Sequence, residues 1–140
     1  MLRSVLDCII PKTSVLPGAG ELGVAEHVEG VSGTTQHNRR RLSEGLKAVD
    51  VNSFMMYARE FDDLSDDEKI CLLKQLESEL PDFFQLLIKE TYAGYYTNFK
   101  ILKAKGLRLR SPQPEGFKLD EFDLSLLRNV QKRAKFYRDD

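Results

Sequence analysis

Apolar residues recur at helical spacing near the start of this chain. Four of them occupy positions i, i+3, i+4 and i+7, and Pro11 follows directly. This spacing places the four side chains on one face of a helix of about ten residues, which the proline ends. The four residues are Leu2, Val5, Leu6 and Ile9.

The pattern that follows alternates between breaks and further helices. Two prolines and two glycines occur among residues 11–20, which predicts a turning loop. A second short helix is expected over residues 21–29, and the glycines of a loop over residues 30–35 end it. A third helix covers residues 34–57, with a break predicted at the polar stretch 50–52. The apolar positions of the third helix are Leu42, Leu46 and Val49.

Two local signals predict where the next helices begin. Ser65 and Glu68 have the spacing of a capping box, in which each side chain accepts a hydrogen bond from the other residue's backbone amide. Pro81 suits the first turn of the following helix, because an N–H group there would have no helical partner. The apolar stripe of that helix consists of Phe84, Leu87, Ile88, Thr91 and Tyr95.

The rest of the chain predicts a basic loop and a last helix. Two prolines and two glycines interrupt residues 100–118, and helical spacing returns over residues 120–138. We therefore predict an all-α protein with a single domain over residues 1–140, folded as an orthogonal or irregular bundle of about five to six helices. Its loops are expected at residues 11–20, 30–35 and 100–118.

Charge and hydropathy limit what such a protein can bind. The 140 residues include 21 basic and 22 acidic side chains, so no net field draws the molecule to nucleic acid. No apolar run approaches the roughly 20 residues that cross a bilayer, and no direct membrane insertion is expected. The opening residues are too charged for a signal peptide. A cytoplasmic protein and a protein whose export signal was removed are both consistent with this.

Patterns typical of catalysis and metal binding are missing. The two histidines, His27 and His37, have no nucleophile motif near them and are interpreted as surface or capping residues. The acidic pairs at residues 62–63 and 66–67 lie around the start of a helix, where the helix dipole stabilises carboxylates. We therefore predict no catalytic residue, no cofactor and no metal.

Two cysteines, Cys8 and Cys71, lie far apart in the sequence. They lack the spacing of a zinc or iron–sulfur site. Each has apolar neighbours, which favours buried free thiols, although the sequence leaves a disulfide between them open.

A partner-binding surface is the remaining functional prediction. Aromatic residues form a second stripe on the helix that follows Pro81, and basic residues come directly after it. Tyrosine and arginine are enriched where protein interfaces carry energy, so this region is the best candidate for binding another protein. The alternative is that the aromatic residues fill the protein's own core. The predicted set is Tyr92, Tyr95, Tyr96, Phe99, Lys103, Arg108 and Arg110.

Three segments, taken in order, resemble the gluconate 2-dehydrogenase subunit 3 family. The first combines LDCIIPKT at residues 6–13 with PGAGELGV at residues 17–24. The second is FDDLS at residues 61–65, and the third runs from FFQLL at residues 83–87 to TYAGYY at residues 91–96. The resemblance covers roughly the first hundred residues. The Asp-Pro and Gly-Gly-Asn stretch that usually follows in the family is absent here.

The resemblance implies a function that the spacing alone does not. Members of the family are small, non-catalytic subunits of periplasmic dehydrogenase complexes. In those complexes a large FAD-containing subunit oxidises a sugar or alcohol, and a cytochrome c subunit takes the electrons. The small subunit stabilises the large one and helps to export it. The alternatives are a free-standing interaction module unrelated to oxidoreductases and, in third place, an enzyme built around a buried ionisable cluster at His27.

Overall fold

The computed structural model of the protein describes residues 1–107 and residue 132. The described helices all lie in one compact unit, Met1–Leu109, and no strand occurs within residues 1–107. The all-α fold class is therefore confirmed. Apart from residue 132, the helix predicted over residues 120–138 lies outside the described residues, so the single domain over residues 1–140 stays a prediction. The helices are α1 (Leu2–Ile9), α2 (Val24–Gly33), α3 (Gln36–Tyr57), the 3-10 helix η1 (Phe61–Asp63), α4 (Asp66–Glu79), α5 (Pro81–Thr97) and α6 (Phe99–Ala104).

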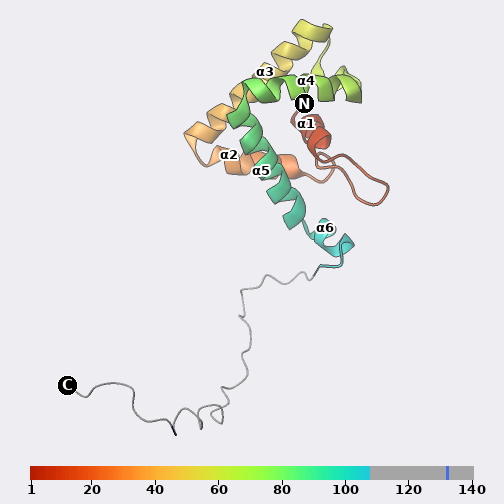
Figure 1. Cartoon of the computed structure of the whole chain (residues 1–140), viewed down its shortest axis with the longest axis vertical. Coiled ribbons are helices and arrows are strands. Elements are labelled where there is room, and N and C mark those ends of the chain that lie inside the picture. The colour runs from red at the N-terminus through yellow and green to blue at the C-terminus, as the bar shows by residue number, and fades with distance from the viewer. Residues whose placement is uncertain (108–131, 133–140) are drawn as a thin grey trace, which may run out of the picture. The chain divides into compact units, whose positions relative to one another are not determined.

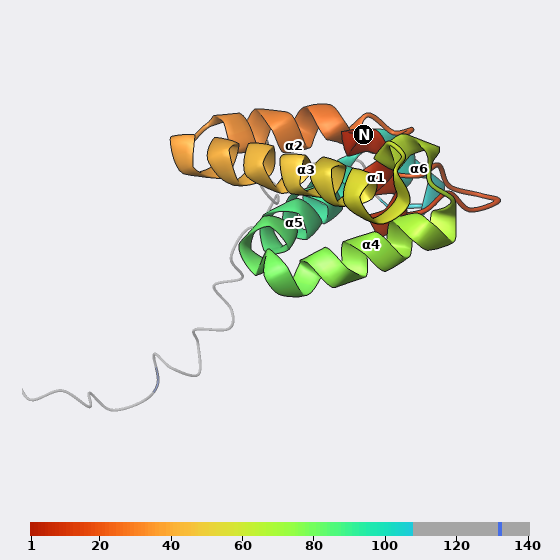
Figure 2. The same cartoon turned by 90° about the horizontal axis from the view of Figure 1, so that it is seen from above.

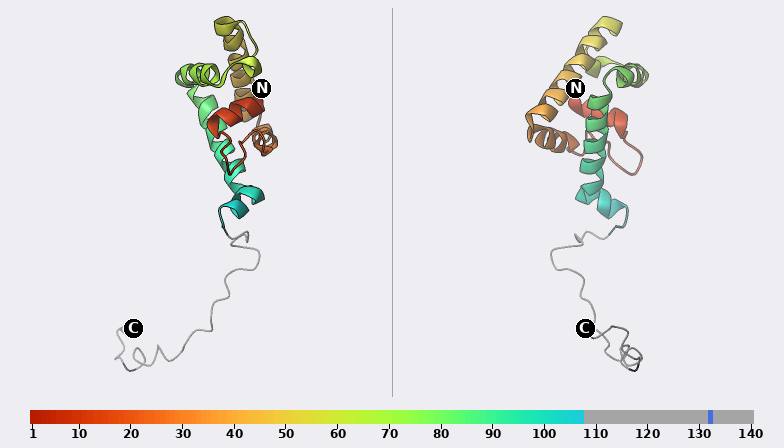
Figure 3. Two further views of the ribbon diagram at one scale, coloured as in Figure 1. Left: turned by 90° about the vertical axis from the view of Figure 1, so that its right-hand side faces the viewer. Right: turned by 60° about the vertical axis from the view of Figure 1, so that its left-hand side comes forward.

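Helix α5 is the element around which the other helices pack. It contacts α1, α2, α3 and α4 along its length, and α6 follows at its C-terminal end (Figure 1). Seen from above, α2 and α3 lie side by side as an antiparallel pair, and α1 contacts both α2 and α4 (Figure 2). The further views in Figure 3 show that α6 lies at the end of α5 that is distant from α4. One side of α5 is thereby covered by other helices.

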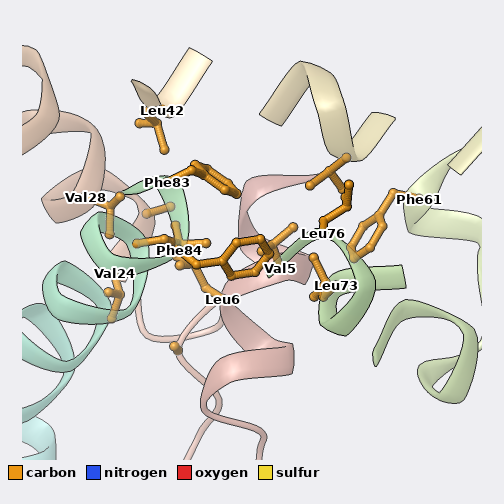
Figure 4. Packing of buried hydrophobic residues seen from close by; sticks show 14 of the residues in the cluster. Val5, Leu6, Val24, Val28, Leu42, Phe61, Leu73, Leu76, Phe83 and Phe84 are labelled. Atoms are coloured by element: carbon orange, nitrogen blue, oxygen red, sulfur yellow. The ribbon is translucent and has the colours of Figure 1, made fainter. Parts of the chain in front are cut away.

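The hydrophobic core is built around the short helix α1. Val5 and Leu6 are fully buried, and Figure 4 shows them in the middle of the cluster, between Phe84 of α5 and Leu76 of α4. Each fully buried aliphatic or phenylalanine side chain contributes about 1.5–3 kcal/mol to folding. An eight-residue helix would not be stable alone in water, so this packing is what holds α1 in place.

Two glycines let helices approach α5 closely. A Cβ atom at Gly45 of α3 would collide with the ring of Phe83. A Cβ atom at Gly94 of α5 would lie 2.8 Å from His27 Cδ2 and 3.0 Å from Val24 Cγ1, both on α2. Real Cβ atoms do not sit this close to packed neighbours, because core side chains already fill the space at crystal-like density. Gly94 therefore fixes the contact between α2 and α5.

The predicted helix starts at Ser65 and Pro81 are confirmed. The Ser65 amide donates to Glu68 Oε2 at 2.8 Å, and the Glu68 amide donates to Ser65 Oγ at 3.4 Å. The hydrogen bond from the Ser65 backbone, together with that from its hydroxyl and with Arg59, lowers the pKa of the Glu68 carboxyl. Pro81 is the first residue of α5. Both signals act over a few residues, which is why sequence alone reveals them.

Three predicted interruptions of helices are wrong. Helix α2 continues through the predicted 30–35 loop as far as Gly33, because Val28 and Ser32 are buried and their packing outweighs the low helix propensity of glycine. Helix α3 is continuous through residues 50–52, where the Asn52 side chain donates to the Ala48 carbonyl at 2.8 Å. The beginning of the predicted 100–118 loop is helix α6, since Ile101 is buried.

Candidate functional site

The outer face of α5 exposes two stacked tyrosines. Tyr92 and Tyr96 lie one helical turn apart, and 44% and 42% of their surfaces are exposed. Their ring centroids are 5.9 Å apart and the ring planes differ by 7°. The Lys105 ammonium nitrogen lies 4.5 Å from the Tyr96 ring centroid, a distance at which cation and ring attract each other. The rings are thus held in place on the protein surface.

The end of α5 brings a third aromatic side chain to this surface. The Asn98 side chain accepts a hydrogen bond from the Lys100 amide at 3.0 Å and so starts α6 directly after α5 ends. Buried Ile101 anchors α6, whereas Phe99 and Lys103 are exposed. The segment after Asn98 therefore presents apolar and basic side chains together.

A shallow apolar groove of about 220 Å³ extends from Tyr92 towards α4 and α1. Its floor and walls come from three helices, and Ile70 on its rim is exposed. The sequence places Ile70 and Ile88 on separate helices and contains no signal that they meet, so the groove was not predicted. The lining residues are Cys8, Ile9, Ile70, Leu73, Lys74, Glu77, Phe84, Ile88 and Tyr92.

Tyr95, which was predicted to belong to the same surface, points into the protein. Only 2% of its surface is exposed, and its hydroxyl donates to the Pro17 carbonyl oxygen at 2.9 Å. Burial raises the pKa of the Tyr95 phenol above its usual value. Tyr95 therefore belongs to the core, as the alternative interpretation of the aromatic residues had it, while Tyr92 and Tyr96 do not.

The loop of residues 11–20, which accepts the Tyr95 hydrogen bond, is also hydrogen-bonded to α1. The Asp7 carboxylate accepts a hydrogen bond from the Gly20 amide at 2.7 Å, and Ala19 is fully buried. A Cβ atom at either Gly18 or Gly20 would collide with the Asp7 carboxylate. The Pro-Gly-Ala-Gly sequence is thus held between Tyr95 of α5 and Asp7 of α1, which gives its glycines and Tyr95 a structural role.

Of the predicted interface residues, Tyr92, Tyr96, Phe99 and Lys103 are all exposed and lie around the junction of α5 and α6; we call these four residues the aromatic surface. Arg108 and Arg110 lie outside the described residues. The partner-binding role of the whole set stays a prediction.

His27 is partly exposed, with 38% of its side-chain surface accessible, but its ring reaches a buried carboxylate. Its Nε2 atom is 3.6 Å from Oε2 of Glu90, a buried carboxylate on α5 whose Oε1 is 3.2 Å from the Lys89 ammonium. The His27 Nε2 atom is itself enclosed and has no hydrogen-bond partner within residues 1–107. His37, in contrast, is exposed at the start of α3. The contacts of the His27 ring with Gly94 give it a packing role between α2 and α5.

Neither cysteine is paired. Cys8 is half-buried, and burial raises the pKa of its thiol. Cys71 is exposed on α4, so the prediction that it is buried is wrong. Its apolar neighbours in the sequence, Ile70 and Leu72, lie on different sides of the helix, and Leu72 alone is buried. Adjacent residues on a helix face directions about 100° apart, which is why neighbours in sequence did not predict burial.

Comparisons with known proteins give one result. A family model described as gluconate 2-dehydrogenase subunit 3 matches residues 1–107, which is well over half of the chain and includes every described helix. No curated protein and no solved structure compared with the chain is significantly similar to it. Among the described helices, none has both the length and the apolar character to cross a membrane.

Proposed function

The chain belongs to the gluconate 2-dehydrogenase subunit 3 family, and from this premise we propose that it binds and stabilises the large FAD-containing subunit of a sugar or alcohol dehydrogenase. The family is named for an accessory subunit of a dehydrogenase complex. The matched residues, 1–107, contain both the aromatic surface and the groove beside it. We therefore assign the contact with the large subunit to this part of the chain.

The observation that carries the proposal is the exposure of the stacked pair Tyr92 and Tyr96, of which Tyr92 also lines an apolar groove. Contiguous apolar surface of this kind marks sites where another molecule binds. Stacked tyrosines suit a binding site, because their rings are already ordered and lose little conformational entropy when a partner covers them. The groove would accept an apolar side chain of the large subunit.

The basic residues next to the rings define the chemistry of the partner. Lys100, Lys103 and Lys105 are exposed beside Phe99 and Tyr96. A complementary surface on the large subunit would carry aspartate or glutamate around an apolar centre. If the small subunit binds the folded form of the large subunit and not its unfolded form, binding stabilises the folded form by mass action. This is the stabilising role that we propose.

The proposal extends to the location and the other partner of the complex. We place the assembled complex in the periplasm, with a cytochrome c subunit as electron acceptor and with the small subunit accompanying the large one across the membrane. These points rest on what the resemblance to the family implies.

Co-purification from the native host tests the proposal. The tagged chain should bring down a flavoprotein, and the double variant Tyr92→Ala/Tyr96→Ala should bind it at least about tenfold more weakly, since losing one interface aromatic costs more than 1 kcal/mol. Val15→Ala, at an exposed apolar position in the 11–20 loop, is the matched control and should bind like the wild type. Circular dichroism would show that the double variant is folded.

Two outcomes would contradict the proposal. In one, no flavoprotein is recovered with the wild-type chain, which would favour a free-standing interaction module. In the other, the folded double variant recovers as much flavoprotein as the wild type, which would move the interface away from the aromatic surface.

A further inference from the structure

The C-terminal turns of α3 expose a second apolar surface. Val51, Phe54 and Met55 recur at i, i+3 and i+4 on one face of the helix, and Met55 is 79% exposed. The buried residues of the same helix, among them Val49 and Ser53, lie on its other face. Nothing within residues 1–107 covers the exposed face. We call Val51, Phe54 and Met55, with the neighbouring exposed Met56, the α3 surface.

This end of α3 is held firmly by its surroundings. Ala58 ends the helix with φ 53°, a left-handed conformation that costs energy for a residue other than glycine, and its amide donates to the Phe54 carbonyl. The Ser53 hydroxyl donates to the Arg59 carbonyl at 2.6 Å. Arg59 in turn lies 2.6 Å from the Glu68 carboxylate. These contacts hold the last turns of α3, whose helix extends to Tyr57 (Figure 1).

Acidic residues flank the α3 surface in the sequence, and we call Asp50, Glu60 and Asp63 its acidic rim. Asp50 lies one turn before Phe54, and Glu60 and Asp63 follow the helix end; all three are exposed and none forms an ion pair within the described part of the chain. The Arg59 charge is compensated by Glu68, which leaves Lys47 as the basic side chain near the start of the α3 surface. The net charge of this rim is negative.

That charge determines which partner fits. Two copies of the α3 surface facing each other would bring their acidic rims together, and such like-charge contacts cost several kcal/mol across an interface. A chain with lysine or arginine around an apolar centre would have the opposite charge. Exposed methionines suit such a contact, because their flexible thioether side chains adapt to the shape of a partner.

The α3 surface is also separate from the aromatic surface. The two lie at opposite ends of the described helices in Figure 1, at the end of α3 and around α6. Their charges are opposite, since the aromatic surface carries Lys100, Lys103 and Lys105. A partner surface that is complementary to one would repel the other.

We propose that the α3 surface is a second docking site, which binds a protein chain that presents apolar side chains within a basic rim and that differs from the chain on the aromatic surface. The statement that the two chains differ rests on the proposed function of the aromatic surface. The small subunit would then join two proteins of opposite surface charge.

Site-specific photocrosslinking of the full chain in its native host tests this proposal. A photoreactive phenylalanine analogue is placed at Met55, at Tyr92 and, as a control, at the exposed residue Gln75 of α4. Adducts are identified and their linked peptides mapped by mass spectrometry. We expect Met55 to link to a peptide that contains lysine or arginine beside apolar residues, in a different chain from the one linked by Tyr92, and Gln75 to give neither adduct.

Charge reversal completes the test. In a Glu60→Lys/Asp63→Lys background the yield of the Met55 adduct should fall about tenfold, because a basic rim would then meet a basic partner. The Tyr92 adduct should be unchanged. The proposal is overturned if Met55 gives no adduct while Tyr92 does, if charge reversal leaves its yield unchanged, or if it links to the chain linked by Tyr92. It is also overturned if Met55 links to a peptide of this chain's own sequence, in the same molecule or in a second copy. Failure of the Tyr92 adduct alone would count against the proposed function instead.

Discussion

The inner and outer faces of α5 carry the same kind of residue for different purposes. Tyr95 and Tyr96 are neighbours in the sequence and their rings meet edge to face with centroids 5.3 Å apart. Yet Tyr95 is buried and hydrogen-bonded to Pro17, whereas Tyr96 is exposed and stacked on Tyr92. The comparison teaches that an aromatic stripe can be divided between the core and the exposed surface within one helical turn.

Under the proposed function, the division would separate stability from assembly. Residues of the inner face, such as Leu87 and Thr91, are fully buried within this protein, and the Thr91 hydroxyl donates to the Leu87 carbonyl of the same helix at 2.6 Å. Residues of the outer face would find their partners in another protein. Substitutions on the inner face should therefore lower the free energy of unfolding, and substitutions on the outer face should leave it unchanged while weakening the complex.

The largest effect is expected for Leu87→Ala on the inner face. Removing a fully buried leucine side chain should lower the free energy of unfolding by about 2–5 kcal/mol, because transfer energy is lost and a cavity is left. Tyr92→Ala, five residues along on the outer face, should change it by no more than about 0.5 kcal/mol. Urea unfolding followed by circular dichroism measures both. Equal losses would show that α5 has no functional division.

The second-largest difference in stability is expected when alanine replaces each of two glycines. Gly94→Ala should destabilise the protein by about 1–3 kcal/mol, since its Cβ atom would press against His27 and Val24. Gly30→Ala in α2 meets no atom within 4 Å and should stabilise the protein by about 0.5–1 kcal/mol through helix propensity. Thermal unfolding of the two variants should shift in opposite directions. If both variants shift the unfolding temperature in the same direction, Gly94 is not needed for the close contact between α2 and α5.

Removing one hydroxyl from each of the adjacent tyrosines gives a smaller difference. Tyr95→Phe leaves the Pro17 carbonyl without its donor and should lower the free energy of unfolding by about 1 kcal/mol. Tyr96→Phe removes an exposed hydroxyl, for which no hydrogen bond within residues 1–107 is found, and should have almost no effect on stability. Chemical denaturation at neutral pH is the measurement. Matching stabilities of the two variants would contradict the assignment of Tyr95 to the core.

The smallest effect is expected at alkaline pH. Burial raises the pKa of Tyr95 in the folded protein, so the folded state holds this proton more tightly than the unfolded state does. The contribution to stability is fully present below the unfolded tyrosine pKa, about 10, and is lost as the pH rises through the higher folded value. The free energy of unfolding should therefore fall more steeply between neutral and alkaline pH for the wild type than for Tyr95→Phe. If the two plots of unfolding free energy against pH are parallel, ionisation of Tyr95 does not contribute to the pH dependence of stability.

Features that depend on a few neighbouring residues could be predicted from the sequence alone. The capping box at Ser65, the helix start at Pro81 and the end of α1 before Pro11 each involve groups within one helical turn. The periodic burial of Phe84, Leu87 and Thr91 follows from helical geometry in the same way. The residues that carry the family resemblance also lie in the sequence itself, and the match over residues 1–107 confirms that assignment.

Other features were decided only when helices met. The sequence indicated a tyrosine-rich stripe but could not divide it, because the partner of Tyr95 is a carbonyl 78 residues away in the chain. The groove beside Tyr92 needs α1, α4 and α5 together, and the continuity of α2 through Gly30 depends on packing against other elements. Local patterns indicate where helices begin and which residues share a face, since caps and helical periodicity involve neighbouring residues. Which side of an element is buried, and which is left for another protein, depends on contacts between distant residues, and only the tertiary structure contains those.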